Sequence, residues 1–259
     1  QIDNGSSDNC AIDQITISQT DFDCSHTGTQ TINFTVTDPH GNSTTVPAKI
    51  IIKDITNPTA IGKDITVNLD PSGNISITPN LVDNGSSDNC GAPTLSLSKS
   101  TFDCNETGDN TITLTATDAS GNSNSTNIIV TVNDNTNPTL VLQDITVRVD
   151  ANGTYDMNIA EVVITNNDNC TTPTLSPLIT TFSCADIGST QSVIVTATDA
   201  SGNITTETAQ VTVTDNTNPI ALITDNQEFD LDPTGNISIT ATQIDNGSSD
   251  NCAIDQITI

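Results

Sequence analysis

The chain repeats itself at a nearly fixed period. The tripeptide Asp-Asn-Cys occurs four times, with successive copies 80, 80 and 82 residues apart, at Cys10, Cys90, Cys170 and Cys252. The string QIDNGSSDNCAIDQITI at residues 1–17 returns unchanged at residues 243–259. Periods of this kind are typical of arrays in which each copy folds as one unit. We therefore predict modules at residues 1–57, 58–137, 138–218 and 219–259, the first and last being cut within a repeat.

Inside each repeat, apolar residues alternate with polar ones as they do in β-strands. In residues 111–117, Ile112, Leu114 and Ala116 fall on one face and four threonines on the other. Turn-forming strings such as DPSGN (70–74) and DASGN (118–122) interrupt these segments at intervals typical of β-sandwiches. The sequence predicts an all-β fold of tandem immunoglobulin-like antiparallel β-sandwich modules, each of about 80 residues, arranged end to end.

The cysteines recur in pairs. A second cysteine follows 14 positions after each of the first three Asp-Asn-Cys copies, which predicts disulfides within repeats: Cys10–Cys24, Cys90–Cys104 and Cys170–Cys184. Cys252 would then pair with a cysteine beyond residue 259. A metal site is the alternative, but the chain has no Cys-x-x-Cys pair or Cys/His cluster. Closing a loop of about 15 residues stabilises by about 3 kcal/mol, and disulfides indicate an oxidising, extracellular setting.

The charge is strongly acidic, with 32 Asp and Glu against 5 Lys and Arg and a formal net charge of −27. Only four of the acids are Glu, whereas Asp is both a turn former and a short carboxylate suited to hard cations. Nucleic acid and anionic membranes would be repelled, so neither is expected as a partner. No segment approaches the length of an apolar transmembrane helix, and membrane insertion is not expected.

Two recurring strings carry a resemblance to a known family. TDPHGN (37–42) and TDASGN (117–122, 198–203) accompany SSDNC (6–10, 86–90) and NNDNC (166–170). Together they resemble the hyalin repeat (HYR) family of extracellular immunoglobulin-like modules, common in giant bacterial surface proteins. Arrays rich in Asn, Thr and Asp that carry disulfides look most like the gliding-motility adhesins of Bacteroidota. The resemblance implies a cell-surface filament exported by a dedicated secretion system.

The linkers suggest a calcium site. NDNTNP (133–138) and TDNTNP (214–219) look like the linkers of cadherins, which supply oxygen ligands to bridging Ca²⁺. In an immunoglobulin-like module, two loops lie at the pole where the chain enters, so a linker should meet the Asp-Asn-Cys loop and the TDASGN turn that follow it. The expected ligands, junction by junction, are Asp54, Asn57, Asp88 and Asp118; Asp134, Asn137, Asp168 and Asp199; and Asp215, Asn218 and Asp250, while Asp8 and Asp38 would face an upstream linker.

The same residues have a simpler interpretation without a metal. Asp118 could cap its own hairpin turn through backbone hydrogen bonds, and Asp88 could only support the loop beside the cysteine. Both interpretations stay open at the level of sequence. If the carboxylates converge without a cation, like-charge repulsion would push the junctions apart, whereas Ca²⁺ would stiffen them.

Function follows from these features by elimination. Enzyme activity is not expected, because the two histidines occur in one repeat each and the cysteines are assigned to disulfides. The near-identical repeats favour a stalk, and the resemblance implies that it belongs to a long secreted adhesin for attachment or gliding. The expected partners are further copies in the same chain and, through a tip outside this sequence, external surfaces or polysaccharide. The alternatives are an array of carbohydrate- or protein-binding modules, or a surface-layer or phage-decoration protein.

Overall fold

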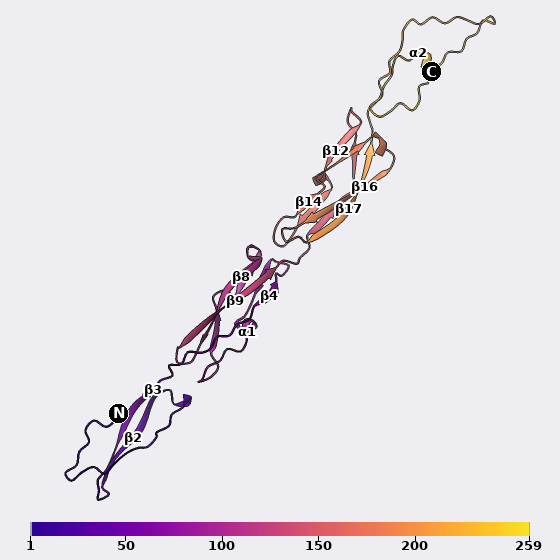
Figure 1. The fold of residues 1–259 in the computed structure, drawn as a ribbon. Coiled ribbons are helices and arrows are strands. Elements are labelled where there is room, and N and C mark those ends of the chain that lie inside the picture. Colours follow the sequence, from indigo (N-terminus) through magenta and orange to yellow (C-terminus); the bar gives the residue numbers. More distant parts are fainter. Residues whose placement is uncertain (1, 259) are drawn as a thin grey trace. The chain divides into compact units, whose positions relative to one another are not determined.

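The computed structural model describes residues 2–258, and its regular secondary structure is mostly β-strand (Figure 1). The chain divides into two compact units, one comprising Gln1–Leu69 with Asn74–Asn133 and the other Asp70–Gly73 with Asp134–Ile259. The only α-helices among the described residues are single turns, α1 (Pro79–Val82) and α2 (Ala241–Ile244). The prediction of an all-β fold is therefore confirmed.

The first unit contains strands of two consecutive repeats. In the first repeat, β1 (Gln14–Ile17), β2 (Gly28–Thr37) and β3 (Ser43–Ile52) form a three-stranded antiparallel sheet. In the second, the sheet order is β4-β9-β8-β6, with a separate pair β5-β7. Their bounds are β4 Ile65–Asn68, β5 Asn74–Ser76, β6 Thr94–Leu97, β7 Thr101–Asp103, β8 Gly108–Thr117 and β9 Ser123–Asn133. Short 3-10 helices, η1 (Cys24–His26) and η2 (Cys104–Glu106), precede β2 and β8.

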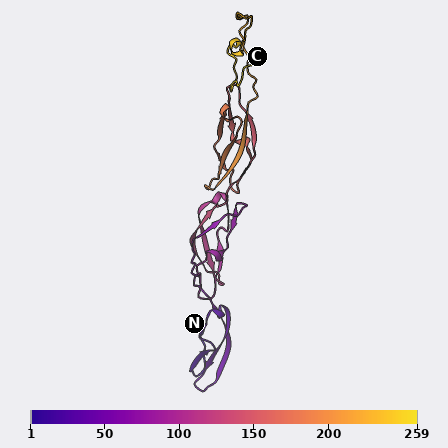
Figure 2. The same cartoon turned by 90° about the vertical axis from the view of Figure 1, so that its right-hand side faces the viewer.

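The second unit repeats this plan with one more strand pair. The sheet β11-β17-β16-β14 is accompanied by the pairs β10-β13 and β12-β15. The long strand β17 runs beside β16 along its length in both views (Figure 1, Figure 2). The bounds are β10 Thr139–Leu142, β11 Ile145–Arg148, β12 Thr154–Asn158, η3 Ile159–Glu161, β13 Val163–Asn167, β14 Thr174–Ser176, β15 Ile179–Ser183, η4 Cys184–Asp186, β16 Thr190–Thr198 and β17 Ile204–Thr214.

The hydrophobic core lies on the strand faces that the alternation of apolar and polar residues predicts. Ile112, Leu114 and Ala116 on β8 are all buried, and Leu114 and Ala116 are 0% exposed. In the second unit, one cluster of buried side chains draws on all three of its sheets, with Leu140 from β10, Met157 from β12 and Val195 from β16. Facing sheets that share a core in this way form the expected immunoglobulin-like β-sandwich.

One strand pairing in the second repeat and one in the third differ from the purely antiparallel prediction. The first strand of the repeat runs parallel to the last one, with Ile65 of β4 opposite Val130 of β9 and Ile145 of β11 opposite Val211 of β17. The physical reason is connectivity, because the strands between them make a crossover of the length that parallel pairing requires. The last strand is thereby held on both sides immediately before the linker begins.

We predict that Leu114→Ala lowers the free energy of unfolding by about 2–5 kcal/mol, the cost of a cavity in a closed core. Ile129→Ala is the matched control, since Ile129 lies on the adjacent strand β9 but is 40% exposed. The control should cost less than half as much. Urea denaturation followed by circular dichroism measures both, and equal losses would contradict the assigned core face.

Candidate functional site at the module junctions

The disulfides join consecutive repeats, which overturns the predicted pairing within repeats. Cys24 is bonded to Cys90, and Cys184 is bonded to Cys252, with Cα atoms 5.2 Å apart in both pairs. The predicted bonds Cys10–Cys24, Cys90–Cys104 and Cys170–Cys184 are therefore wrong, and Cys252 has its partner within the chain. Cys104 and Cys170 are also disulfide-bonded, and Cys10 is an exposed free cysteine.

The reason is that the two cysteines of one repeat lie at opposite ends of their module. Cys104 precedes β8, which begins at Gly108. Cys90 follows Asp88, whose carboxylate lies within 4.8 Å of Asp118 in the turn after β8. The ten residues of β8 therefore separate the two cysteines by about 30 Å. A disulfide requires Cα atoms less than about 7 Å apart, so only a neighbouring repeat can supply the partner.

Glycine allows one of these cross-links to form. Gly153, in the turn between β11 and β12, has a positive φ of 75°. A Cβ at this position would lie 2.6 Å from Cys184 Sγ and 2.7 Å from the Asn251 carbonyl oxygen. The side-chain amide of Asn251 donates to the carbonyl of Asp150 at 3.0 Å in the same turn. The turn of one repeat thus packs directly on the Asp-Asn-Cys loop of the next.

The first linker brings three predicted carboxylates together. Oxygens of Asp54, Asp88 and Asp118 all lie within 4.8 Å of one another. Each is held by its own loop, since Thr56 N donates to Asp54 Oδ1 at 3.0 Å and Cys90 N donates to Asp88 Oδ2 at 2.9 Å. The remaining oxygens, Asp54 Oδ2 and Asp88 Oδ1, are buried and have no hydrogen-bond partner. The fourth predicted ligand, Asn57, is exposed.

The turn between β8 and β9 is tied to this linker by a residue that sequence reasoning did not assign. Asn122 donates through its backbone to Asp118 Oδ1 at 2.8 Å and through its side chain to Asp118 Oδ2 at 2.7 Å. The same amide also donates to the Asp54 carbonyl at 3.1 Å. The recurrence of Asn after Gly in all three TDxxGN strings is the signal that could have identified it.

The second linker repeats this arrangement with small differences. Asp134 and Asp168 have oxygens within 4.8 Å of each other, and Asp168 Oδ1 is buried without a partner. Asn203 connects Asp134 to Asp199, donating to the Asp134 carbonyl at 3.1 Å and to Asp199 Oδ2 at 2.8 Å. The predicted ligand Asp199 itself is not part of the carboxylate cluster. Asp134 and Asp199 are only 6% and 7% exposed. Cys170 Sγ is also close, but as a disulfide sulfur it is not available as a thiolate ligand.

At the third linker the predicted groups are less gathered. Asp215 Oδ1 accepts from the amide of Asn251 at 3.2 Å, and Asp250 Oδ1 is buried without a partner. Among residues 2–258, Asp215 and Asp250 belong to no cluster of three possible ligand residues, unlike the aspartates of the other two linkers. The predicted ligands Asn137 and Asn218, at the second and third linkers, are exposed like Asn57.

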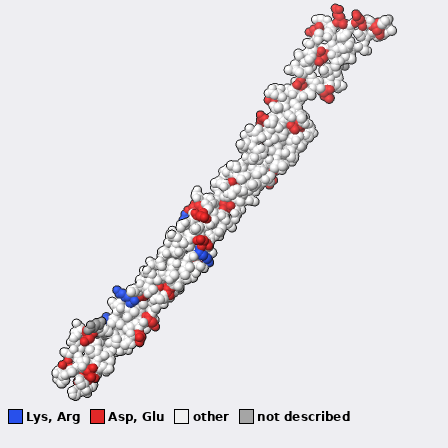
Figure 3. Space-filling view, viewed as in Figure 1, with Lys and Arg blue, Asp and Glu red and all other residues white. Residues whose placement is uncertain are grey.

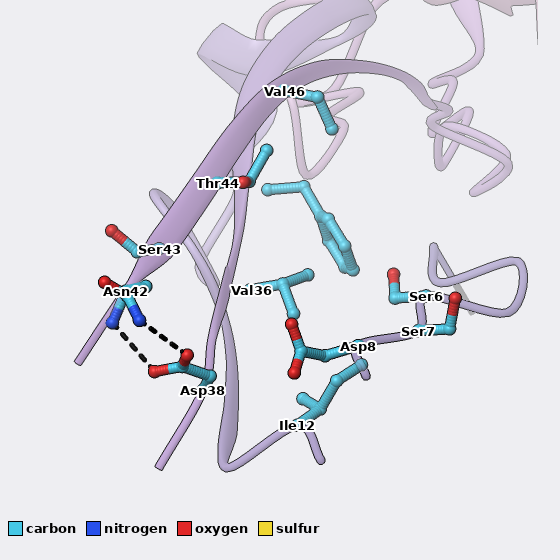
Figure 4. Close-up of a pocket in the computed structure, with 11 residues that line it drawn as sticks. Ser6, Ser7, Asp8, Ile12, Val36, Asp38, Asn42, Ser43, Thr44 and Val46 are labelled. Carbon is cyan, nitrogen blue, oxygen red and sulfur yellow. Dashed lines mark hydrogen bonds between the residues drawn. The ribbon is translucent and has the colours of Figure 1, made fainter. Parts of the chain in front are cut away.

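Asp8 and Asp38, predicted to face an upstream linker, line one hollow of the first repeat (Figure 4). Asn42 closes the turn on Asp38 with backbone and side-chain bonds of 2.8 Å each. Asp8 Oδ1 accepts from Cys10 N at 2.8 Å. The two loops therefore repeat the geometry of their equivalents at the first and second linkers.

Hydrogen bonds within the turn favour the ionised form of Asp38 and of Asp118. The side chain and backbone of Asn42 lower the pKa of Asp38 from its ordinary value. Burial acts to raise the pKa of Asp118, but hydrogen bonds, led by those of Asn122, outweigh it and the pKa is lowered. Figure 3 shows Asp and Glu spread over the visible surface with few basic groups among them. The clustered charges at the linkers therefore have no Lys or Arg ion partner among the described residues.

The donor set at the first two linkers fits a hard divalent cation. Ca²⁺ takes about six to eight oxygen ligands from carboxylates, carbonyls and amides. Each linker offers carboxylate oxygens that converge, and at least one of them is buried without a hydrogen-bond donor. Asp54, Asp88 and Asp168 each accept from their own loop through one oxygen, as the turn interpretation expects. The other oxygen of each is buried without a donor, and these are the oxygens that a cation could use.

Comparison with known proteins gives similarity to solved structures alone. No protein-family model matches the chain, and no curated protein matches it. Extracellular cadherin domains 1–5 of protocadherin gamma B2 are 15% identical over 89% of this chain and 53% of that one, with a TM-score of 0.32. Extracellular domains 3–5 of Drosophila OTK are 11% identical over 71% of this chain and 70% of that one, with a TM-score of 0.30. Titin domains I67–I69 are 12% identical over 72% of this chain and 75% of that one, with a TM-score of 0.32. The chain spans about half the length of the protocadherin structure.

The cross-links also bear on location. Disulfides persist in oxidising surroundings, which indicates an extracellular or secreted repeat region. Among the described residues no helix has the length and apolar character needed to span a bilayer.

We predict that Gly153→Ala disrupts the Cys184–Cys252 cross-link, because its Cβ would overlap the Cys184 sulfur. Gly235→Ala is the matched control, as Gly235 has a similar φ of 78° but nothing within 4 Å of its Cβ. Both variants carry the roughly 1–2 kcal/mol cost of a left-handed alanine. Only Gly153→Ala should expose two additional titratable thiols and lower the melting temperature further. Equal thiol counts in the two variants would contradict the contact.

A second prediction concerns acid. Backbone hydrogen bonds from Thr154 and Asn152 lower the pKa of Asp150 from its ordinary value of 3.8. A lowered folded-state pKa means that this stability is complete above the ordinary pKa and is lost as the pH falls through the folded-state value. The unmodified chain should therefore have a higher free energy of unfolding than Asp150→Asn, by a constant amount near neutral pH. This difference should disappear as the pH falls through the folded-state pKa of Asp150. Urea midpoints between pH 7 and 2 test this, and a gap unchanged at the lowest pH would contradict it.

Proposed function

We propose that this chain is part of the stalk of a long, secreted cell-surface adhesin. The observation that supports it most is that each described disulfide joins the second cysteine of one repeat to the first cysteine of the next. Covalent bonds between neighbouring modules transmit tension along an array, which is the requirement of a stalk. Near-identical repeats, such as the string at residues 1–17 and 243–259, make an array longer without adding different binding surfaces.

The resemblance of the TDASGN and DNC strings to HYR modules supports a bacterial surface role in attachment or gliding. In this proposal a tip outside the sequence contacts the external surface or polysaccharide, and the modules described here act as a spacer. A catalytic role is not proposed, because the convergent carboxylates lie in polar loops and each uses an oxygen to support its own turn. A carbohydrate platform would need exposed aromatic rings, whereas the hydroxyl of Tyr155, the one tyrosine, donates to Glu161.

Calcium at the linkers is the second element of the proposal. Asp54, Asp88 and Asp118 place carboxylate oxygens within 4.8 Å of one another, so repulsion between like charges opposes the arrangement in the absence of a cation. A bound Ca²⁺ would offset this repulsion and use the two buried oxygens that no donor contacts. The ion would then fix the linker against the two loops of the following module.

We predict that Ca²⁺ raises the melting temperature of the chain and that EGTA reverses the effect, by mass action on the folded state. Asp88→Asn removes a converging charge but keeps an oxygen that can accept from Cys90 N. It should weaken Ca²⁺ binding at the first linker at least tenfold in isothermal titration calorimetry. Loss of a direct ligand is the physical reason.

The matched control for this experiment is Asp109→Asn in the same module. Asp109 accepts from Thr131 Oγ1 on the adjacent strand and belongs to no carboxylate cluster. It makes the same change in net charge, so its Ca²⁺ response should equal that of the unmodified chain. If the melting temperature of the unmodified chain is the same in Ca²⁺ and in EGTA, the proposed calcium sites are wrong. The disulfides would then be the only proposed link between modules.

The stalk role is tested in the source organism. An antibody against the chain should label intact cells, and disruption of the gene should reduce attachment to a solid surface. Labelling that requires permeabilised cells would contradict the proposed location. Unchanged attachment and motility in the disrupted strain would contradict the adhesive role.

A further inference from the structure

The described disulfides close large loops and leave short segments outside them. Cys24 and Cys90 are 66 positions apart, and the loop between them contains β2, β3, β4 and β5. Cys184 and Cys252 are 68 positions apart and enclose β16 and β17. In contrast, only 14 positions separate Cys90 from Cys104, where the next cross-link begins. Most residues of a repeat therefore lie inside a covalent loop.

Tension along a chain follows the shortest covalent route. When the ends are pulled, force that reaches Cys24 crosses the disulfide to Cys90 and does not pass through the enclosed backbone. The same holds between Cys184 and Cys252. The long paired strands β2–β3 and β16–β17, which carry the buried core residues Phe34 and Val195, are thus outside the path of the force.

The force instead acts on the short segment between cysteines. Between Cys90 and Cys104 this segment holds β6, paired with the edge of β8, and β7, paired with β5. These strands have four and three residues. Fully straightened, 14 positions reach about 50 Å, compared with about 270 Å for a whole repeat of 80 residues without cross-links.

We propose that the disulfides act as mechanical bypasses, so that the enclosed β-strands cannot be pulled apart and the array resists lengthening under load. Unfolding by force is then confined to the short segments between cysteines and is released by a reductant. The inference goes beyond the stalk role and can fail separately from it. Mechanical extension is a property of the chain in isolation, whereas the stalk role depends on the cell.

Single-molecule pulling of the whole chain by its two ends tests the proposal. The oxidised chain should reach a contour length at least about 450 Å shorter than the chain pulled in dithiothreitol, since two loops totalling about 130 residues remain closed. Cys24→Ser combined with Cys90→Ser should restore about 220 Å without a reductant, the length of one loop.

Cys10→Ser is the matched control, because Cys10 is exposed and makes no disulfide. It should leave the contour length unchanged under both conditions. An oxidised chain that extends as far as the reduced chain would overturn the proposal. So would a Cys24/Cys90 double variant that gains no length while its circular dichroism shows a folded β-protein.

Discussion

The position of the cysteines at the two ends of each module is the constraint on which the other features depend. Cys90 and Cys104 lie near opposite ends of β8, a strand of ten residues, so they are too far apart to form a disulfide with each other. Bonds between consecutive repeats are the remaining solution, and they require the turn of one repeat to touch the loop of the next. Gly153 and Asn251 show this requirement at the level of single atoms. A loop of 66 positions stabilises by about 4 kcal/mol on the chain-entropy model, somewhat more than the short loop expected from sequence.

The carboxylate clusters lie at the same junctions as the disulfides and also restrain the linkers. Asp54 and Asp88 each commit one oxygen to the local backbone and leave the other buried and unpaired. Asn122 then ties the following turn to the linker carbonyl. Hydrogen bonds, disulfides and the proposed ion therefore restrain one region, in which the linker would otherwise be a flexible connection between small cores.

Much of this architecture was predictable from sequence, because alternation and repetition are local signals. Ile112, Leu114 and Ala116 are buried as expected, and the grouping of Asp54, Asp88 and Asp118 followed from knowing which loops share a pole. Disulfide pairing was not predictable in this way, since spacing along the chain does not show that an extended segment carries Cys104 to the far end. Asn122 was also missed, because its amide serves two loops that only the fold brings together.

The connectivity of the cysteines is the central claim, and peptide mapping under non-reducing conditions tests it most directly. Proteolysis of the chain at acidic pH, followed by mass spectrometry, should yield cross-linked peptides that contain Cys24 with Cys90 and Cys184 with Cys252. Acidic conditions suppress thiol exchange, so the pairs recovered are those of the folded protein. Peptides that join Cys90 to Cys104 or Cys170 to Cys184 would contradict the account and return the disulfides to the interior of each repeat.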